Sequence, residues 1–215
     1  MTIYTFPSSL WHIASVQFPL QPLSTSSPQS AFNPFMFTDG PTSEFWQCTA
    51  TLTPADDRDR RAIDALLRKL RGKRNKIRLY DPSRVRLGAG ATGPTVNFAA
   101  AAAAGDMTIQ LTGFLPNEAL GLAADDVLGV GENLYAVSDD APTDADGNIT
   151  LNVLPPMRQG AAIGDPVTLA SDDIESITGP TGLFQLVGGA DAATVVAGGI
   201  RQPLQLQFVE DPDFD

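Results

Sequence analysis

The sequence predicts a mainly β protein: a β-sandwich with one packed α-helix, plus a small inserted β-barrel-like domain. Three observations predict this class. Most apolar segments alternate with period two, as expected for strands that bury one face. A single segment, between residues 53 and 72, combines helical spacing with helix start and stop signals. From Gly88 the composition changes abruptly, towards glycine, alanine and aspartate with few aromatic residues.

The first strands are expected at the N-terminus. Thr2–Phe6 has strand composition and ends at Pro7, and Trp11–Leu20 is a second extended segment, interrupted by Pro19. A third strand follows a turn at residues 39–41. It alternates regularly and is predicted to present on one face Trp46, Cys48, Ala50 and Leu52.

A helix is predicted between Thr53 and Gly72. Acidic residues suit its first turn, Lys69 and Arg71 suit its last turn, and Gly72 is the predicted C-terminal stop. Its apolar residues recur at offsets of three, four and seven and form one stripe, made of Ile63, Leu66, Leu67 and Leu70. Such a stripe has to pack on a sheet, because an isolated helix of this length is marginally stable.

Alternating strands flank the middle of the chain. Lys76–Tyr80 predicts a half-buried strand with its charged side chains outward, and it stops at Asp81-Pro82. Gly182–Val187 and Arg201–Val209 alternate in the same way near the C-terminus. Because a regular final strand usually pairs with early elements, we expect one sandwich domain from residues 1–87 and 172–215, with residues 88–171 inserted.

The inserted segment predicts five short antiparallel strands around tight turns such as Gly131-Glu132 and Asp146-Gly147. Five strands of this length suit a small barrel-like unit. They are expected at Met107–Leu111, Asp126–Val130, Asn133–Val137, Ile149–Val153 and Pro166–Leu169.

Charge is distributed unevenly along the chain. The net charge is −11; the first 86 residues carry +5 (12 basic minus 7 acidic) and the remainder −16 (2 minus 18). This polarity suits head-to-tail contacts between copies or between different ring proteins; a solvated basic helix beside an acidic sheet is the alternative. The interface candidates are Arg58, Arg61, Arg68, Arg71, Lys73 and Arg74.

No convergent catalytic set is evident, so the sequence predicts a non-enzyme without catalytic, cofactor or metal residues. His12 has no acidic neighbour in sequence, and Cys48 lies in an apolar alternating run. Adjacent carboxylates such as Asp125-Asp126 point to opposite faces of a strand and are expected at turns and on the surface. Met1 opens no basic-then-apolar leader, and the most apolar stretch is too short to span a bilayer, so we expect a soluble protein without a secretion signal.

Three weaker patterns favour structural readings. The acidic segment at 140–148 lacks the ordered spacing of a calcium loop, and a hairpin turn explains it better, although a weak calcium site stays open. The Gly88–Gly93 run resembles part of a dinucleotide fingerprint but predicts a linker. The basic run at 68–76 lacks nearby stacking aromatics, so at most incidental contact with DNA is expected.

A family resemblance runs along most of the chain. It rests on the tryptophan-bearing strand at 45–52, the leucine stripe at 63–70, Leu70-Arg71-Gly72 and the strand at 77–82, followed by Gly105–Gly113, Asp126–Gly131 and Leu154-Pro155-Pro156-Met157-Arg158. In this order, these motifs resemble the distal tail proteins of bacteriophages with long, non-contractile tails, and related tail proteins.

The resemblance implies a structural protein of the virion tail tip, assembled in the host cytoplasm without a cofactor. It implies a ring, expected to be a hexamer, with the tail tube protein and the baseplate hub or fibre protein as partners and no membrane contact. Two alternatives stay open. One is a tail-tube or tail-terminator protein; the other is a carbohydrate-binding module for host recognition, which predicts an exposed aromatic platform that Trp11 and Trp46 could supply only if neither is buried.

Overall fold

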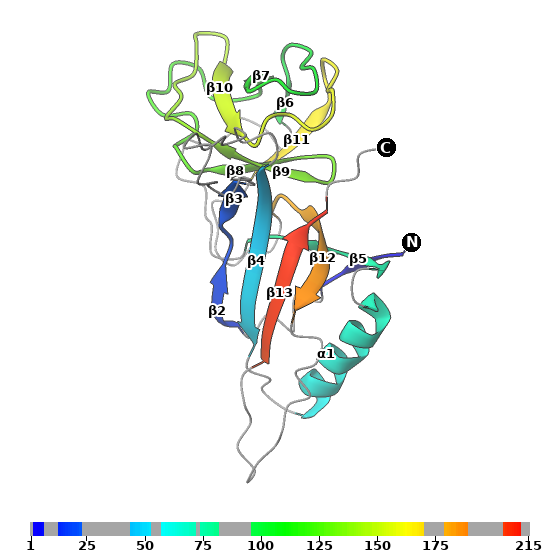
Figure 1. The fold of residues 1–215 in the computed structure, drawn as a ribbon. Coiled ribbons are helices and arrows are strands. Elements are labelled where there is room, and N and C mark those ends of the chain that lie inside the picture. The colour runs from blue at the N-terminus through cyan, green and yellow to red at the C-terminus, as the bar shows by residue number, and fades with distance from the viewer. Residues whose placement is uncertain are drawn as a thin grey trace, which may run out of the picture.

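The computed structural model describes residues 2–6, 13–22, 44–52, 57–71, 74–81, 96–169, 179–188 and 204–211. These residues form a mixed β-sheet with one helix beside it and a closed β-barrel at one end of the sheet (Figure 1). The mainly β class, the one packed helix and the small barrel are as the sequence predicts.

The sheet has seven strands, arranged in the order β1-β5-β12-β13-β4-β2, with β3 also paired to β4. Among the described strands of this sheet, only β1 and β5 run parallel; the other described pairs are antiparallel. The final strand pairs with β4 and β12, which confirms the expectation that it meets early elements. The strands are β1 (Ile3–Thr5), β2 (Ile13–Gln17), β3 (Leu20–Pro22), β4 (Glu44–Leu52), β5 (Lys76–Leu79), β12 (Gly182–Gly188) and β13 (Leu204–Glu210).

A proline divides one edge of this sheet. The segment predicted as one interrupted extended run forms β2 and β3, both paired with β4, with Phe18 and Pro19 between them. Proline has no N–H to offer a strand ladder. The edge is nevertheless held there, because the Gln47 N–H donates to the Pro19 carbonyl at 3.0 Å.

Helix α1 (Asp57–Leu70) packs its apolar stripe on the sheet. Ile63, Leu66 and Leu70 are buried, with Leu67 partly buried beside them. The predicted face of β4 is buried as well, and these side chains share one core with Ile77 and Leu79 of β5. The spacing of the apolar residues therefore identified both sides of this interface correctly.

Six antiparallel strands close the barrel in the order β10-β7-β6-β11-β8-β9. Five match the predicted strands; the sixth, β6, was not predicted and completes the barrel by pairing with both β7 and β11. The strands are β6 (Val96–Phe98), β7 (Thr108–Thr112), β8 (Val127–Val130), β9 (Asn133–Val137), β10 (Asn148–Leu154) and β11 (Pro166–Leu169).

Three turns of the barrel share one construction. In each, an aspartate carboxylate accepts a hydrogen bond from the backbone N–H three residues earlier, at 2.7–2.8 Å, and a strand begins just after it. The residue before the aspartate has positive φ in every case: Gly105, Asp125 and Gly164. The aspartates are Asp106, Asp126 and Asp165, and Asp126 is buried, against the expectation of a surface position.

The position of Lys76 differs from the prediction. Lys76 was predicted to point outward, but its side chain is 3% exposed and its ammonium lies 3.1 Å from the Asp211 carboxylate. That acidic partner, 135 positions away in sequence, is what allows a lysine to be buried there.

The predicted domain boundaries at 87/88 and 171/172 fall outside the described residues, so the division into two domains stays a prediction.

Candidate interaction surface

Six exposed cations occupy α1 and the turn after it. We call them the basic helix surface: Arg58, Arg61, Arg68, Lys69, Arg71 and Arg74. None forms an ion pair with another described residue. Lys73, the remaining interface candidate, lies outside the described residues. The five described interface candidates are thus exposed, and Lys69 joins them on this surface.

Three other basic residues in the described part form ion pairs within the fold. Lys76 pairs with Asp211, Arg78 with Glu132 and Arg158 with Glu210. Each pair joins segments that are distant in sequence. The cations of the basic helix surface have no such role in the described fold, so their charge is available to an external partner.

A pocket of about 450 Å³ opens at the C-terminal end of α1. Its lining brings together three predicted candidates and four residues that were not singled out: Thr2, Tyr4, Arg68, Lys69, Arg71, Arg74 and Asn75. Arg58 and Arg61, on the first half of the helix, are not part of it. No acidic side chain lines the pocket, so it presents positive charge and hydroxyl groups.

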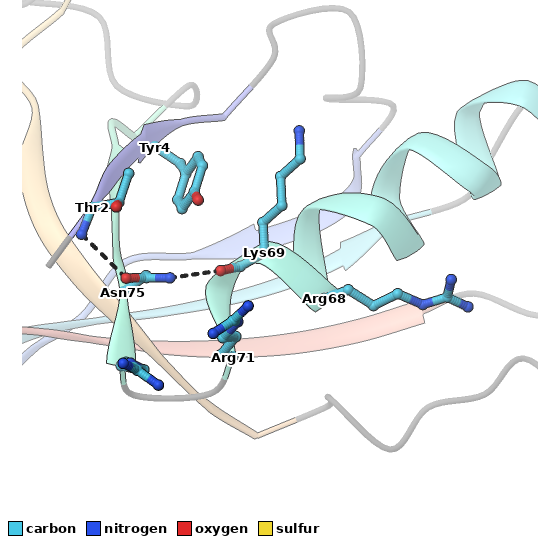
Figure 2. Close-up of a pocket in the computed structure, with 7 residues that line it drawn as sticks. Thr2, Tyr4, Arg68, Lys69, Arg71 and Asn75 are labelled. Atoms are coloured by element: carbon cyan, nitrogen blue, oxygen red, sulfur yellow. Dashed lines mark hydrogen bonds between the residues drawn. The ribbon is translucent and has the colours of Figure 1, made fainter.

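Asn75 fixes the wall of this pocket. Its side-chain amide donates to the Lys69 carbonyl at 2.7 Å, and its carbonyl oxygen accepts from the Thr2 N–H at 3.1 Å. Figure 2 shows Asn75 between β1 and the last turn of α1, linking the two. One side chain thereby hydrogen-bonds a carbonyl in the last turn of the helix and ties the N-terminal strand to the helix.

Arg71 ends the helix in the left-handed region, with φ +50°. The predicted stop was Gly72, one residue later and outside the described residues, but the left-handed position next to Leu70 belongs to an arginine. Glycine is the residue that adopts this conformation without cost. An arginine here therefore sacrifices backbone stability while adding positive charge to the pocket.

Replacing Arg71 with glycine tests that interpretation. We expect Arg71→Gly to raise the free energy of unfolding by about 1 kcal/mol, because it relieves the left-handed strain. Denaturant-induced unfolding, followed by circular dichroism, measures this difference. Arg74→Gly, which also removes one exposed cation but at a residue without positive φ, is the matched control; equal effects of the two changes would contradict the strain argument.

The barrel presents the opposite charge. Two segments, at 117–126 and 138–148, lie together through the bond from the Thr143 N–H to the Glu118 carbonyl and the bridge between Leu122 and Ala141. They carry no basic residue. We call their six partly or fully exposed acids the acidic end: Glu118, Asp125, Asp139, Asp140, Asp144 and Asp146.

The tip of the acidic end is a hydrogen-bonded turn. The Asp144 carboxylate accepts hydrogen bonds from the Asp146 and Asn148 backbone N–H groups, both at 2.8 Å, and these bonds, with one from the Asn148 side chain, lower the pKa of Asp144. Gly147 has φ +77°, and a Cβ at this position would clash with the Phe114 carbonyl oxygen. The segment considered for calcium thus ends in a turn in which the Asp144 carboxylate binds the backbone of its own turn.

A buried ion pair joins the barrel to the sheet. Arg158, after β10, makes a two-pronged contact with the carboxylate of Glu210 on β13, and their side chains are 6% and 0% exposed. The guanidinium also donates to the Glu44 carbonyl at 3.0 Å, and the Glu210 carboxylate accepts from the Trp46 N–H at 2.9 Å. Strands β4 and β13 are therefore both attached to the barrel through this pair.

Further contacts connect the barrel and the sheet; together with the pair of Arg158 and Glu210, we call them the joint. The Trp46 indole N–H donates to the Leu134 carbonyl at 3.0 Å, and Arg78 of β5 bonds to Glu132 at 2.9 and 3.0 Å, which raises the pKa of the guanidinium. The sheet core also includes Val127, Leu134 and Ala136 of β8 and β9. Barrel and sheet thus share apolar core as well as ionic contacts.

The joint was not predicted, although the sequence contained a signal for it. Arg158 is the one basic residue between positions 87 and 200. A lone arginine next to the buried Met157, in a strongly acidic stretch, is a good candidate for an ion pair within the fold. Its partner, Glu210, is 52 positions away and cannot be identified from spacing alone.

Of the other candidates for chemistry, Cys48 has a structural explanation in the described part. Cys48 is fully buried, and burial raises the pKa of its thiol, so it is not a reactive nucleophile. The described residues contain no group of three metal-ligating side chains and no helix long and apolar enough to cross a membrane. Trp11, His12, Asp172-Asp173 and the Gly88–Gly93 run lie outside the described residues.

Comparisons with known proteins add no family assignment. No protein-family model matches the chain, and no curated protein matches it significantly.

Proposed function

We propose that this chain is a structural component of a bacteriophage tail, a distal tail protein whose copies form a ring. In this proposal the ring, expected to have six members, joins the tail tube to the baseplate hub or fibre at the virion tail tip. The observation that carries the proposal is the basic helix surface: six exposed cations without ion-pair partners in the described fold, on a molecule whose barrel is acidic.

The distribution of charge in space supports assembly. Helix α1 lies beside the sheet and away from the barrel (Figure 1). A molecule with opposite charges on separate parts can place unlike charges in contact in every neighbouring pair of copies. Such head-to-tail contacts form a closed ring when the rotation between copies closes.

The contacts between sheet and barrel support a structural role too. A ring component has to hold its parts in a fixed relation when its neighbours bind. The buried pair of Arg158 and Glu210, with the shared apolar core, does so between sheet and barrel.

The two alternative functions, a carbohydrate-binding module and a tail-tube or tail-terminator protein, are affected differently by the structure. A carbohydrate-binding module needs an exposed aromatic platform, whereas Trp46 is 1% exposed and its indole N–H is engaged with Leu134. That leaves Trp11, outside the described residues, as the only tryptophan for such a role. A tail-tube or tail-terminator protein would also self-associate, and the form of the assembly distinguishes it.

The proposal predicts salt-sensitive self-association. At low ionic strength the purified protein should form oligomers, which we expect to weaken as salt rises from about 0.1 M to about 1 M and screens exposed charges. Mass photometry and sedimentation velocity measure the distribution, and negative-stain imaging shows its shape. Single rings with a central hole support a distal tail protein; stacked tubes favour a tail-tube protein. A monomer at every concentration and salt would contradict the proposal.

A further inference from the structure

The pocket at the end of α1 and the tip of the acidic end are complementary. The pocket is open, measures about 450 Å³ and presents Arg68, Lys69, Arg71 and Arg74 without an acidic residue in its lining. The tip, residues 144–147, is exposed at its first three positions and contains two aspartates and no bulky side chain. A small anionic turn is the kind of element that such a pocket can admit.

From this match we propose that the pocket receives the turn at 144–147 from the barrel of a second copy, so that copies join head to tail. The inference rests on the proposed function, because it names the partner of the basic helix surface within a ring. Arginine is the residue best suited to this contact, since its planar guanidinium can bind a carboxylate with two parallel hydrogen bonds.

The tip enters such a contact already ordered. Hydrogen bonds from Asp146 and Asn148 to Asp144 hold the turn, so little conformational entropy is lost when it docks. Asp146 is exposed, and its carboxylate makes no hydrogen bond or ion pair with a described residue, so it is open to an arginine of the pocket. Asp139, exposed on the neighbouring segment, adds charge at the same end.

The pocket wall is ordered as well. Asn75 anchors it to both β1 and α1, and Arg71 is held at its position by the end of the helix. Nucleic acid is the competing occupant, because phosphates also bind arginine. Charge favours the protein: at −11 the chain repels DNA, whose phosphates carry charge along the whole duplex, more strongly than it repels a second copy, which presents six acids at one end.

Charge reversal on each side separately tests the contact. In the pocket variant, R71E/R74E, the pocket opposes the acidic tip of the next copy. In the tip variant, D139K/D146K, the tip opposes the basic pocket. Each variant alone is expected to self-associate at least about tenfold more weakly than the wild type, because like charges would meet.

Mixing the two variants should restore assembly. The acidic pocket of one variant then meets the basic tip of the other, and the remaining wild-type surfaces match as well. We expect the mixture to recover affinity to within about threefold of the wild type, in oligomers that contain both variants in alternation. Native mass spectrometry, with one variant isotopically labelled, measures how many copies of each variant an oligomer contains.

The matched control is R58E/R61E, which makes the same change of charge on the first half of α1, within the basic helix surface but outside the pocket. It should weaken assembly by less than about threefold. Circular dichroism and thermal unfolding of every variant show whether folding is retained.

The outcomes separate this inference from the proposed function. If the wild type forms rings but the mixture of variants stays dissociated, the docking inference is wrong and the ring proposal stands. If the wild type is monomeric throughout, both fail. If R71E/R74E still forms rings but loses binding to DNA oligonucleotides that the wild type retains, the pocket serves nucleic acid and the inference is likewise overturned.

Discussion

Removing Arg158 alone should destabilise the protein by about 3–5 kcal/mol, since Arg158→Met leaves the buried Glu210 carboxylate without its cation. Small proteins are usually stable by only about 5–15 kcal/mol, so this is a large part of the total. Methionine retains much of the apolar stem of arginine, which limits the loss of packing. The free energy of unfolding from urea titration at neutral pH measures the effect.

A double variant separates the charge from the packing. Arg158→Met combined with Glu210→Gln removes both charges, while the glutamine oxygen can still accept the Trp46 N–H. We expect the double variant to recover at least half of the loss, because a neutral buried pair carries no uncompensated charge. If the double variant were as unstable as the single one, the ion pair would not be the origin of the effect.

Truncating Trp46 should cost a similar amount. Trp46→Ala is expected to lower the free energy of unfolding by about 3–5 kcal/mol, because a large, fully buried ring leaves a cavity between sheet and barrel. Trp46→Phe keeps most of the apolar contact but leaves the Leu134 carbonyl without its donor, so a smaller loss of about 1–3 kcal/mol is expected.

Ile163 gives the control for this pair. Its side chain is 71% exposed in a barrel turn, so Ile163→Ala should change the free energy of unfolding by no more than about 0.5 kcal/mol. Chemical denaturation of the three variants under one set of conditions gives the comparison. A Trp46→Ala loss as small as that of Ile163→Ala would show that Trp46 does not support the joint.

Local patterns predicted the sheet and the helix well. The alternation in β4 and the stripe of α1 each depend on residues close in sequence, and both faces are buried where expected. Failures arose where the deciding partner is distant. Lys76 is buried because Asp211 lies next to it, and β6 has three residues whose strand character becomes evident only through β7 and β11.

In the candidate site too, features set by residues close in sequence were predicted and features that need distant residues were not. The basic residues of the helix were identified from sequence, because their exposure follows from the helical period. The pocket was not, since it also needs Thr2 and Tyr4 from the N-terminal strand, some 70 positions away. The repeated aspartate turns at 103–106, 123–126 and 162–165 were accessible from sequence, and comparing the chain with itself would have found them.

The position of the barrel in the chain bears on how the protein folds. β5 and β12 are hydrogen-bonded neighbours, and Leu79 pairs with Gly182 across 103 positions of sequence that contain the whole barrel. The barrel also brings its own first and last strands together, since Val96 pairs with Val167. Once it has formed, the chain left to close between β5 and β12 shrinks from 102 residues to the 28 at 80–95 and 170–181. Loop-closure entropy then opposes that pairing by about 1 kcal/mol less, so early folding of the barrel speeds completion of the sheet.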